Sequence, residues 1–166
     1  MRDAFGGLVN IAIIVVFMTI VSGYLAFNVS YTKAFKVKNK IISVYEEYDG
    51  CEGTAFKSKC DKEIETYINA MGYNAPTPGN FAKTLNNEDY NASTTRAHAT
   101  ECNNNYGYCV IEFRDALEPN DKINKQYRSF RVVTVVYLDI PIINNIMSGM
   151  NMFQITGDTK KMVYKP

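Results

Sequence analysis

Four cysteines are the residues of this 166-residue chain whose type and spacing most directly suggest chemistry. Eight residues lie between Cys51 and Cys60, and six lie between Cys102 and Cys109. Zinc ligands usually come in pairs two to four residues apart, and the chain has one histidine, so a closed zinc site fits poorly. Disulfide bonds fit better, and of the three connectivities we expect the local one, Cys51 to Cys60 and Cys102 to Cys109. Four free thiols in a reducing compartment are the alternative.

Catalytic chemistry has little support in the sequence. The histidine, His98, lies in TTRAHATE, whose composition predicts an exposed loop. The chain has no Gly-x-Ser-x-Gly motif to present a nucleophile, no phosphate-binding loop and no dinucleotide-binding glycine motif. Its net charge of +1 gives no general basic field for nucleic acid. We therefore expect no enzyme activity, no cofactor, no metal site and no nucleic-acid partner.

The longest apolar segment runs from Leu8 to Phe27 and contains no charged residue. Twenty helical residues span about 30 Å, the thickness of the hydrocarbon core of a bilayer. The segment is therefore expected to cross a membrane. An export signal usually has a shorter apolar core, but Val21-Ser22-Gly23 could serve as a cleavage site, so removal of the segment is the alternative.

The helical pattern continues beyond the apolar segment. Apolar residues recur every seven positions at Phe27, Ala34, Ile41 and Tyr48. Lysines and glutamates occupy the other face, so residues 28–48 predict an amphipathic helix that ends near Gly50. The expected organisation is an N-terminal tail and transmembrane helix at 1–27, its amphipathic continuation at 28–50, and a domain at 51–166. An ordinary juxtamembrane helix lying on lipid is the alternative for the second part.

Two signals conflict over the orientation of this protein. Lysines follow the apolar segment at Lys33, Lys36, Lys38 and Lys40. The positive-inside rule would place them in the cytoplasm, whereas disulfides require an oxidising compartment. We give the cysteines more weight, because lysines on a continuing helix can contact anionic lipid headgroups or a neighbouring subunit. The expected topology is a single-pass membrane protein with its C-terminal domain extracytoplasmic, at the cell surface.

The remaining residues predict a small α+β domain. A helix is expected from Asp61, as its N-cap, to Gly72. Residues 73–105 are expected to form a long loop, or loops with minor structure, that faces a partner. The segment YCVIEFR alternates and predicts a half-buried strand with Cys109, Ile111 and Phe113 on its buried side. YRSFRVVTVVYLDI predicts the strongest strand, and MFQITGDTKKMVY predicts two short strands joined by a turn at Gly157-Asp158.

A long N-terminal helix packed on a small antiparallel sheet is the plan of pilins and pseudopilins. In its opening helix and its closing pattern IPIINNIM…MFQITGDTKKM, the chain resembles tight-adherence-type pilin-like proteins of the type IV filament superfamily. The resemblance implies a structural subunit of a surface filament or export assembly, with other pilin-like subunits or assembly-platform proteins as partners. It also implies processing after a glycine, at Gly6 or Gly7. The glutamate that normally follows such a site is absent from the segment, so the alternatives are that the N-terminus is retained or that the resemblance is architectural only.

Two sets of residues are expected to pack helices of different subunits together. Within the apolar segment they are the small or polar residues Asn10, Thr19, Ser22 and Gly23, although serine and threonine could instead bind their own helix carbonyls. In the amphipathic half they are Phe27, Tyr31, Ala34, Phe35, Ile41 and Tyr45. Two other functions remain open: an anchored cell-surface binding module, and a secreted enzyme with a cleft around His98.

Overall fold

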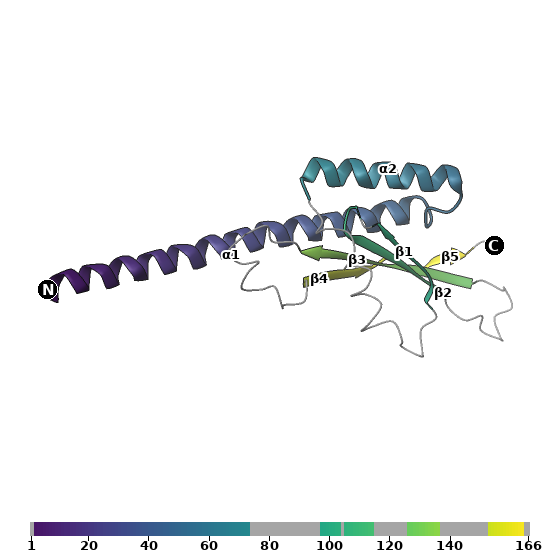
Figure 1. The fold of residues 1–166 in the computed structure, drawn as a ribbon. Coiled ribbons are helices and arrows are strands. Elements are labelled where there is room, and N and C mark those ends of the chain that lie inside the picture. Colours follow the sequence, from purple (N-terminus) through teal and green to yellow (C-terminus); the bar gives the residue numbers. More distant parts are fainter. Residues whose placement is uncertain (1, 74–96, 104, 115–125, 137–152, 165–166) are drawn as a thin grey trace.

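The computed structural model describes residues 2–73, 97–103, 105–114, 126–136 and 153–164. Two helices, α1 (Arg2–Glu47) and α2 (Thr54–Met71), precede the strands β1 (Ala97–Asn103), β2 (Tyr108–Arg114), β3 (Gln126–Val136), β4 (Phe153–Asp158) and β5 (Met162–Tyr164). Figure 1 shows α1 as a long rod whose second half lies against the sheet and whose first half projects beyond it. The expected α+β architecture, with a long N-terminal helix on a small antiparallel sheet, is confirmed. We call residues 9–27 of α1 the rod, and the rest of α1 from residue 28 together with α2 and the strands the cap.

The helix α1 runs for 46 residues without interruption. Its sequence contains no proline, and the first proline of the chain is Pro76. The helix ends as a Schellman motif, in which the Gly50 N–H donates to the Tyr45 carbonyl at 2.8 Å and Asp49 is left-handed with φ of 50°. The expected end near Gly50 is confirmed, with Asp49 taking the left-handed position.

The helix α2 begins earlier than the sequence pattern predicted. It starts at Thr54 after Gly53, whose carbonyl accepts from the Lys57 N–H at 2.8 Å. Cys60, four residues before Ile64, extends the buried stripe by one more turn, and residues 54–59 before it are exposed, so an apolar stripe does not mark where the helix begins. Asp61 therefore lies inside the helix and is not its N-cap. The predicted end is correct, since Gly72 caps the helix in the left-handed conformation.

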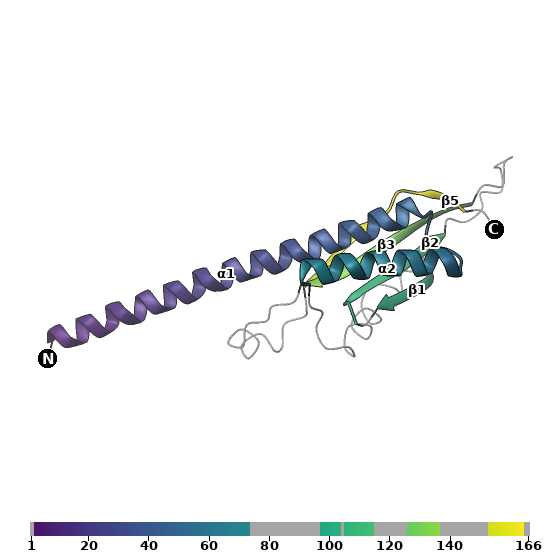
Figure 2. The same cartoon turned by 90° about the horizontal axis from the view of Figure 1, so that it is seen from above.

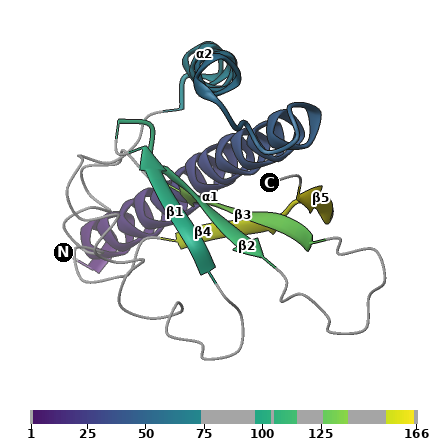
Figure 3. The same cartoon turned by 90° about the vertical axis from the view of Figure 1, so that its right-hand side faces the viewer.

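The strands form one antiparallel sheet in the order β1-β2-β3-β4. The strand β1 lies within the segment that was predicted to be a long loop, or loops with minor structure, and the long-loop alternative is wrong for residues 97–103. Its residues are mostly small or polar, so the sequence pattern did not indicate a strand. The strand β1 pairs with β2, and in the turn between them the Gly107 N–H donates to the Asn103 carbonyl at 2.9 Å. Figure 3 shows the sheet from its end, with α1 lying on it and α2 beside α1.

The predicted hairpin between β4 and β5 is also wrong. Both strands pair antiparallel with β3, so they run in the same direction along one edge of it. Thr159 interrupts them: its N–H donates to the Phe130 carbonyl, and its Oγ1 accepts from the Phe130 N–H, both at 2.9 Å. A type II′ turn needs positive φ at its glycine, which Gly157 does not have. The break therefore acts as a bulge in one edge strand.

The main core lies between α1, α2 and the facing side of the sheet. On α1 the fully buried side chains are Ala34, Val37, Ile41 and Val44. They meet Ile64 and Ile68 of α2 and Val132 and Val136 of β3 within one apolar cluster. The helix also bonds to the sheet, since the Thr134 hydroxyl donates to the Ala34 carbonyl at 3.2 Å. Over β4 the helix comes so close that a Cβ on Gly157 would lie 2.9 Å from Cδ1 of Ile42.

The other side of β2 and β3 is buried as well. Its apolar side chains are 0% exposed at Cys109, Ile111, Val133 and Val135. The predicted grouping of Cys109, Ile111 and Phe113 on one face is correct. The expectation of a half-buried strand is wrong, because Tyr108 and Val110 on the opposite face are buried against the helices.

Two disulfide bonds fasten the cap. Cys51–Cys60 joins the turn after α1 to α2, and Cys102–Cys109 joins β1 to β2 at directly paired positions. These pairs are the expected local connectivity.

Candidate membrane and assembly surface

The rod exposes apolar side chains on all its sides. Between Ile11 and Ile20 every residue is exposed, and the large apolar side chains are 58–64% accessible to solvent. Figures 1 and 2, which are turned by 90° from each other, both show this part of α1 standing free of the sheet and of α2. An apolar surface of this size has no counterpart on a typical soluble monomer. The rod therefore needs lipid or other apolar helices around it.

Among the described residues, one helix is long and apolar enough to cross a membrane. Within Val9–Glu47 the mean hydropathy of its most apolar stretch of 18 residues is 2.2. This property is consistent with single-pass anchoring. An export signal near an N-terminus satisfies the same criteria. Cleavage near Ser22 or after Gly6 or Gly7 stays a prediction, and both glycines lie within α1.

The small and polar residues of the rod do not all behave alike. Asn10, Thr19 and Ser22 are exposed, and Gly23 is partly exposed. The Thr19 hydroxyl donates to the Val15 carbonyl at 2.8 Å, so its polar group is already satisfied within the helix. Asn10, Ser22 and Gly23 remain open to a neighbouring helix.

The structure divides the expected packing residues of the amphipathic half into two groups. Ala34, Ile41 and Tyr45 are buried in the cap, where the Tyr45 ring lies 5.2 Å from the ring of Phe130. These three side chains cannot contact a second subunit while the cap is folded. Heptad spacing could not reveal this, because a helix that packs on its own sheet and one that packs on another helix bury similar stripes.

The other group stays at the surface. Tyr31 is 45% and Phe35 is 41% exposed, whereas Phe27 is partly buried. Their rings follow one another along the helix, with centroids 6.2 Å apart between Phe27 and Tyr31 and 6.5 Å apart between Tyr31 and Phe35. This aromatic row lies directly after the rod.

Most of the lysines after the rod have partners within the cap. Lys33 donates to the Gly72 carbonyl at 3.1 Å, and Lys40 donates to Oε1 of Glu63 at 2.6 Å. Lys38 is only 8% exposed, and its Nζ lies 4.2 Å from the centroid of the Phe35 ring. Lys36 is exposed. The spacing of the lysines therefore has structural causes as well as any role toward lipid.

The seam between α1 and α2 carries a small charged network. The Lys40 hydrogen bond lowers the pKa of the Glu63 carboxyl, and the same bond raises the pKa of Lys40. The Tyr48 hydroxyl also donates to Glu63, at 3.3 Å, and the negative charge of that carboxylate raises the pKa of Tyr48. These contacts hold α2 beside α1.

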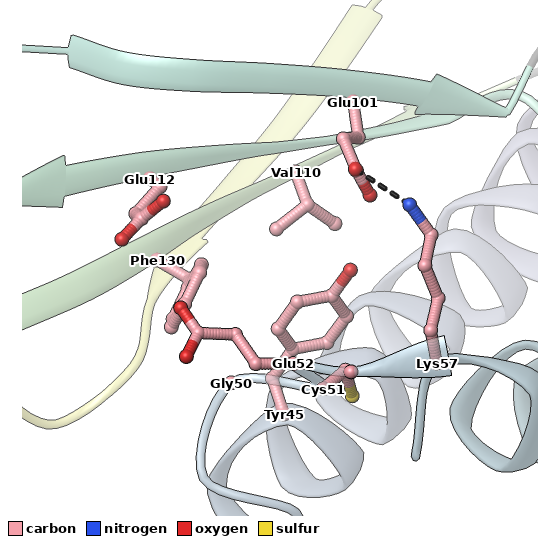
Figure 4. Close-up of a pocket in the computed structure, with 10 residues that line it drawn as sticks. Tyr45, Gly50, Cys51, Glu52, Lys57, Glu101, Val110, Glu112 and Phe130 are labelled. Atoms are coloured by element: carbon pink, nitrogen blue, oxygen red, sulfur yellow. Dashed lines mark hydrogen bonds and ion pairs between the residues drawn. The ribbon is translucent and has the colours of Figure 1, made fainter. Parts of the chain in front are cut away.

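A cavity of about 260 Å³ lies beside the turn that joins α1 to α2. Figure 4 shows Tyr45 and Phe130 inside it, with charged side chains around them. The carboxylates already have cationic partners: Glu101 binds Lys57 at 2.6 Å, Glu112 binds Arg114 at 2.7 Å, and Glu52 binds Arg128. In the described part of the chain, no group of three or more His, Cys, Asp or Glu side chains could hold a metal ion. The carboxylates that line the cavity are thus paired with cations, and its described lining residues include no nucleophile placed beside a general base.

The segment expected to face a partner is only partly described. Residues 74–96 lie outside the described residues. His98 lies in β1, not in a loop as predicted, and its side chain is outside the description too. The proposed enzyme cleft around His98 therefore stays a prediction.

Sequence reasoning missed Arg128, the residue that ties the sheet to the α1–α2 turn. Its guanidinium donates to the Asp49 carbonyl and to Glu52, and its side chain is 3% exposed. It lies 5.5 Å from the Phe130 ring centroid. The signal was available, because Arg128 lies on the same face of the predicted strand YRSFRVVTVVYLDI as the apolar residues Phe130 and Val132.

The geometry thus joins an exposed apolar helix to a folded cap and provides surfaces for binding. Comparison with protein-family models, curated proteins and solved structures found no match. Inference about function rests on the residues of this chain.

Proposed function

We propose that this chain is a membrane-anchored structural subunit, pilin-like in plan, whose rod lies in the membrane and packs with other rods in a filament or export assembly. The observation that carries the proposal is the rod itself. It is an apolar helix exposed on every side, and it continues unbroken into the helix that forms the centre of the cap. Because no break separates the two halves, whatever holds the rod also fixes the position of the cap.

The charges and sulfurs support an extracytoplasmic cap. Two formed disulfides fit an oxidising compartment. The lysines that would oppose this topology are largely engaged by the cap, through Gly72, Glu63 and Phe35. Their presence after the rod is therefore weak evidence for a cytoplasmic location.

Assembly would use the positions of the rod that allow close approach. Helices in membranes associate through small residues and polar groups, because lipid gives no hydrophobic drive between them. Asn10, Ser22 and Gly23 are available for this, whereas Ala34, Ile41 and Tyr45 serve the cap. Partners would be other copies of this chain or related pilin-like subunits.

Site-specific photo-crosslinking of the full chain in cell membranes tests the proposal. A benzophenone amino acid replaces Phe17, which is 63% exposed on the rod, and in a matched control it replaces Phe56, which is 53% exposed on α2. Assembly through rods predicts a ladder of crosslinked copies from position 17 and not from position 56. A membrane-retained chain that gives only monomer from position 17 would show that the rod is a simple anchor.

The second candidate is a singly anchored cell-surface binding module. It is favoured by the 260 Å³ cavity beside the α1–α2 turn, because that turn lies at the end of α1 opposite the rod. The crosslinking result separates the two, since a binding module would stay monomeric in the membrane.

A further inference from the structure

Four aromatic rings form a continuous row where the rod enters the cap. Phe153, the first residue of β4, packs edge-on against Phe27 with ring centroids 5.6 Å apart. Tyr31 and Phe35 continue the row along α1. Phe153 is 43% exposed, although it belongs to the sheet. A residue more than 120 positions away in sequence thus extends the aromatic surface sideways from the helix.

The charge around this row has one sign along the helix. Between Asp3 and Glu46 the sequence of α1 contains no acidic residue. Lys33 and Lys36 follow Tyr31 and Phe35 in the sequence; Lys36 is exposed, whereas Lys33 donates to the Gly72 carbonyl. The surface therefore combines partly exposed rings with positive charge, which is the combination that a membrane interface with anionic headgroups attracts.

The height of the row along the helix fits the same partner. It begins at Phe27, where the apolar segment ends. From Phe27 to Tyr31 the helix advances about 6 Å, and the polar layer on each side of a bilayer is about 5–8 Å thick. When the apolar segment Leu8 to Phe27 fills the hydrocarbon core, Phe27, Phe153 and Tyr31 reach the headgroup layer, and Phe35, about 12 Å beyond Phe27 along the helix, lies outside it.

We propose that Phe27, Tyr31 and Phe153, together with Lys36, form a collar that seats the cap on anionic phospholipid headgroups. This inference rests on the proposed membrane insertion of the rod. The collar has two points of attachment, one on α1 and one on β4. It therefore turns the β4 edge of the sheet toward the bilayer and leaves the α1–α2 turn facing away.

Tryptophan fluorescence of the full chain in vesicles tests the collar, because the chain contains no tryptophan. Three single-tryptophan variants are compared: Phe153→Trp reports the collar, Phe17→Trp reports the rod, and Phe56→Trp is the matched control on the cap. The last two positions are 63% and 53% exposed. The vesicles contain zwitterionic and anionic phospholipids, with quenching spin labels placed either at the headgroup or deep in the acyl chain.

The collar predicts blue-shifted emission and stronger headgroup-level than deep quenching for Phe153→Trp, with neither effect for Phe56→Trp. It also predicts that the headgroup-level quenching weakens in purely zwitterionic vesicles or when Lys36→Gln is added. Deep quenching of Phe17→Trp with an unquenched Phe153→Trp would overturn the collar and leave the anchor intact. An unquenched Phe17→Trp would instead overturn the anchor, and the collar with it.

Discussion

At the scale of single residues, the turn between α1 and α2 concentrates unusual backbone. Asp49, Gly50, Cys51 and Gly53 all have positive φ, between 50° and 92°. Such conformations are costly for residues with a side chain and persist when their surroundings hold them. Here the surroundings are the disulfide at Cys51, the guanidinium of Arg128 and the ring of Phe130.

A pair of glycine substitutions separates the cost of this backbone from the cost of the contact. Gly50→Ala must accept φ of 92° and would place its Cβ 2.8 Å from Cζ of Phe130. Gly53→Ala must accept φ of 85° but meets nothing within 4 Å. We expect Gly53→Ala to lower the free energy of unfolding by about 1 kcal/mol, and Gly50→Ala to cost about 1–3 kcal/mol more through overpacking.

The measurement is chemical denaturation of both variants and the unsubstituted chain in the same detergent. Equal losses for the two alanine variants would show that the Phe130 ring yields without cost, and that backbone conformation alone makes Gly50 necessary.

At the scale of elements, the sequence pattern identified the helices and strands that carry a strong local apolar pattern. The rod, its amphipathic continuation and the strand around Phe130 and Val132 carry strong apolar patterns, and the structure confirms each as an element. The pattern at Ala34, Ile41 and Tyr45 correctly indicated a buried stripe, but it could not say that β3 and β4 would cover it. That depends on contacts between residues some 100 positions apart, such as Thr134 with Ala34.

The elements that were missed have weaker local signals. The strand β1 is made of AHATECN, which has little apolar alternation, and its place is set by pairing with β2. The direction of β5 depends on the Thr159 bulge, where a side-chain oxygen replaces a backbone partner. A turn-like Gly-Asp pair suggested a hairpin instead. The residues around Gly157 do not by themselves decide between a hairpin of β4 with β5 and two strands that both pair with β3, because either arrangement gives the backbone groups of β4 and β5 hydrogen-bond partners.

The seam between α1 and α2 leads to a prediction about pH. The Lys40 hydrogen bond lowers the pKa of Glu63, so the folded state binds a proton there less readily than the unfolded chain does. This stabilisation is present above the unfolded pKa of about 4.3 and is lost as pH falls through the lower folded pKa. Because the two side chains are 29% and 34% exposed, we expect it to be below about 1 kcal/mol.

Thermal unfolding of Glu63→Gln and of the unsubstituted chain, followed from pH 6 to pH 3 in steps of about one unit, measures this effect. The variant should be less stable at pH 6, and the difference should shrink toward pH 3. Glu65→Gln on the same helix is the control, since the described residues show no ion pair for Glu65. A difference that stays constant with pH would mean that Glu63 acts through shape and not through charge.

At the scale of the whole molecule, one helix belongs to two environments. Its first half has no buried residue between Val9 and Tyr24, while its second half supplies the centre of the main core. The division falls near Phe27, where the apolar segment ends and the aromatic row begins. The rod therefore contributes little to the stability of the cap, whereas the second half is required for it.

Two truncations test this division. A chain that begins at Asn28 keeps every buried residue of the core cluster on α1 and loses only the partly buried Phe27, so we expect it to fold, to form both disulfides and to remain soluble without detergent. A chain that begins at Asn39 lacks Ala34 and Val37, both 0% exposed, and leaves the Thr134 hydroxyl without the Ala34 carbonyl. Loss of the buried apolar surface and of this bond should lower its unfolding free energy by more than about 3 kcal/mol relative to the first truncation.

Size-exclusion chromatography, circular dichroism and urea unfolding of the two chains provide the comparison. Aggregation of the chain from Asn28 would show that the rod is needed to complete the cap, and equal stability of the two chains would show that α1 is not the centre of the core.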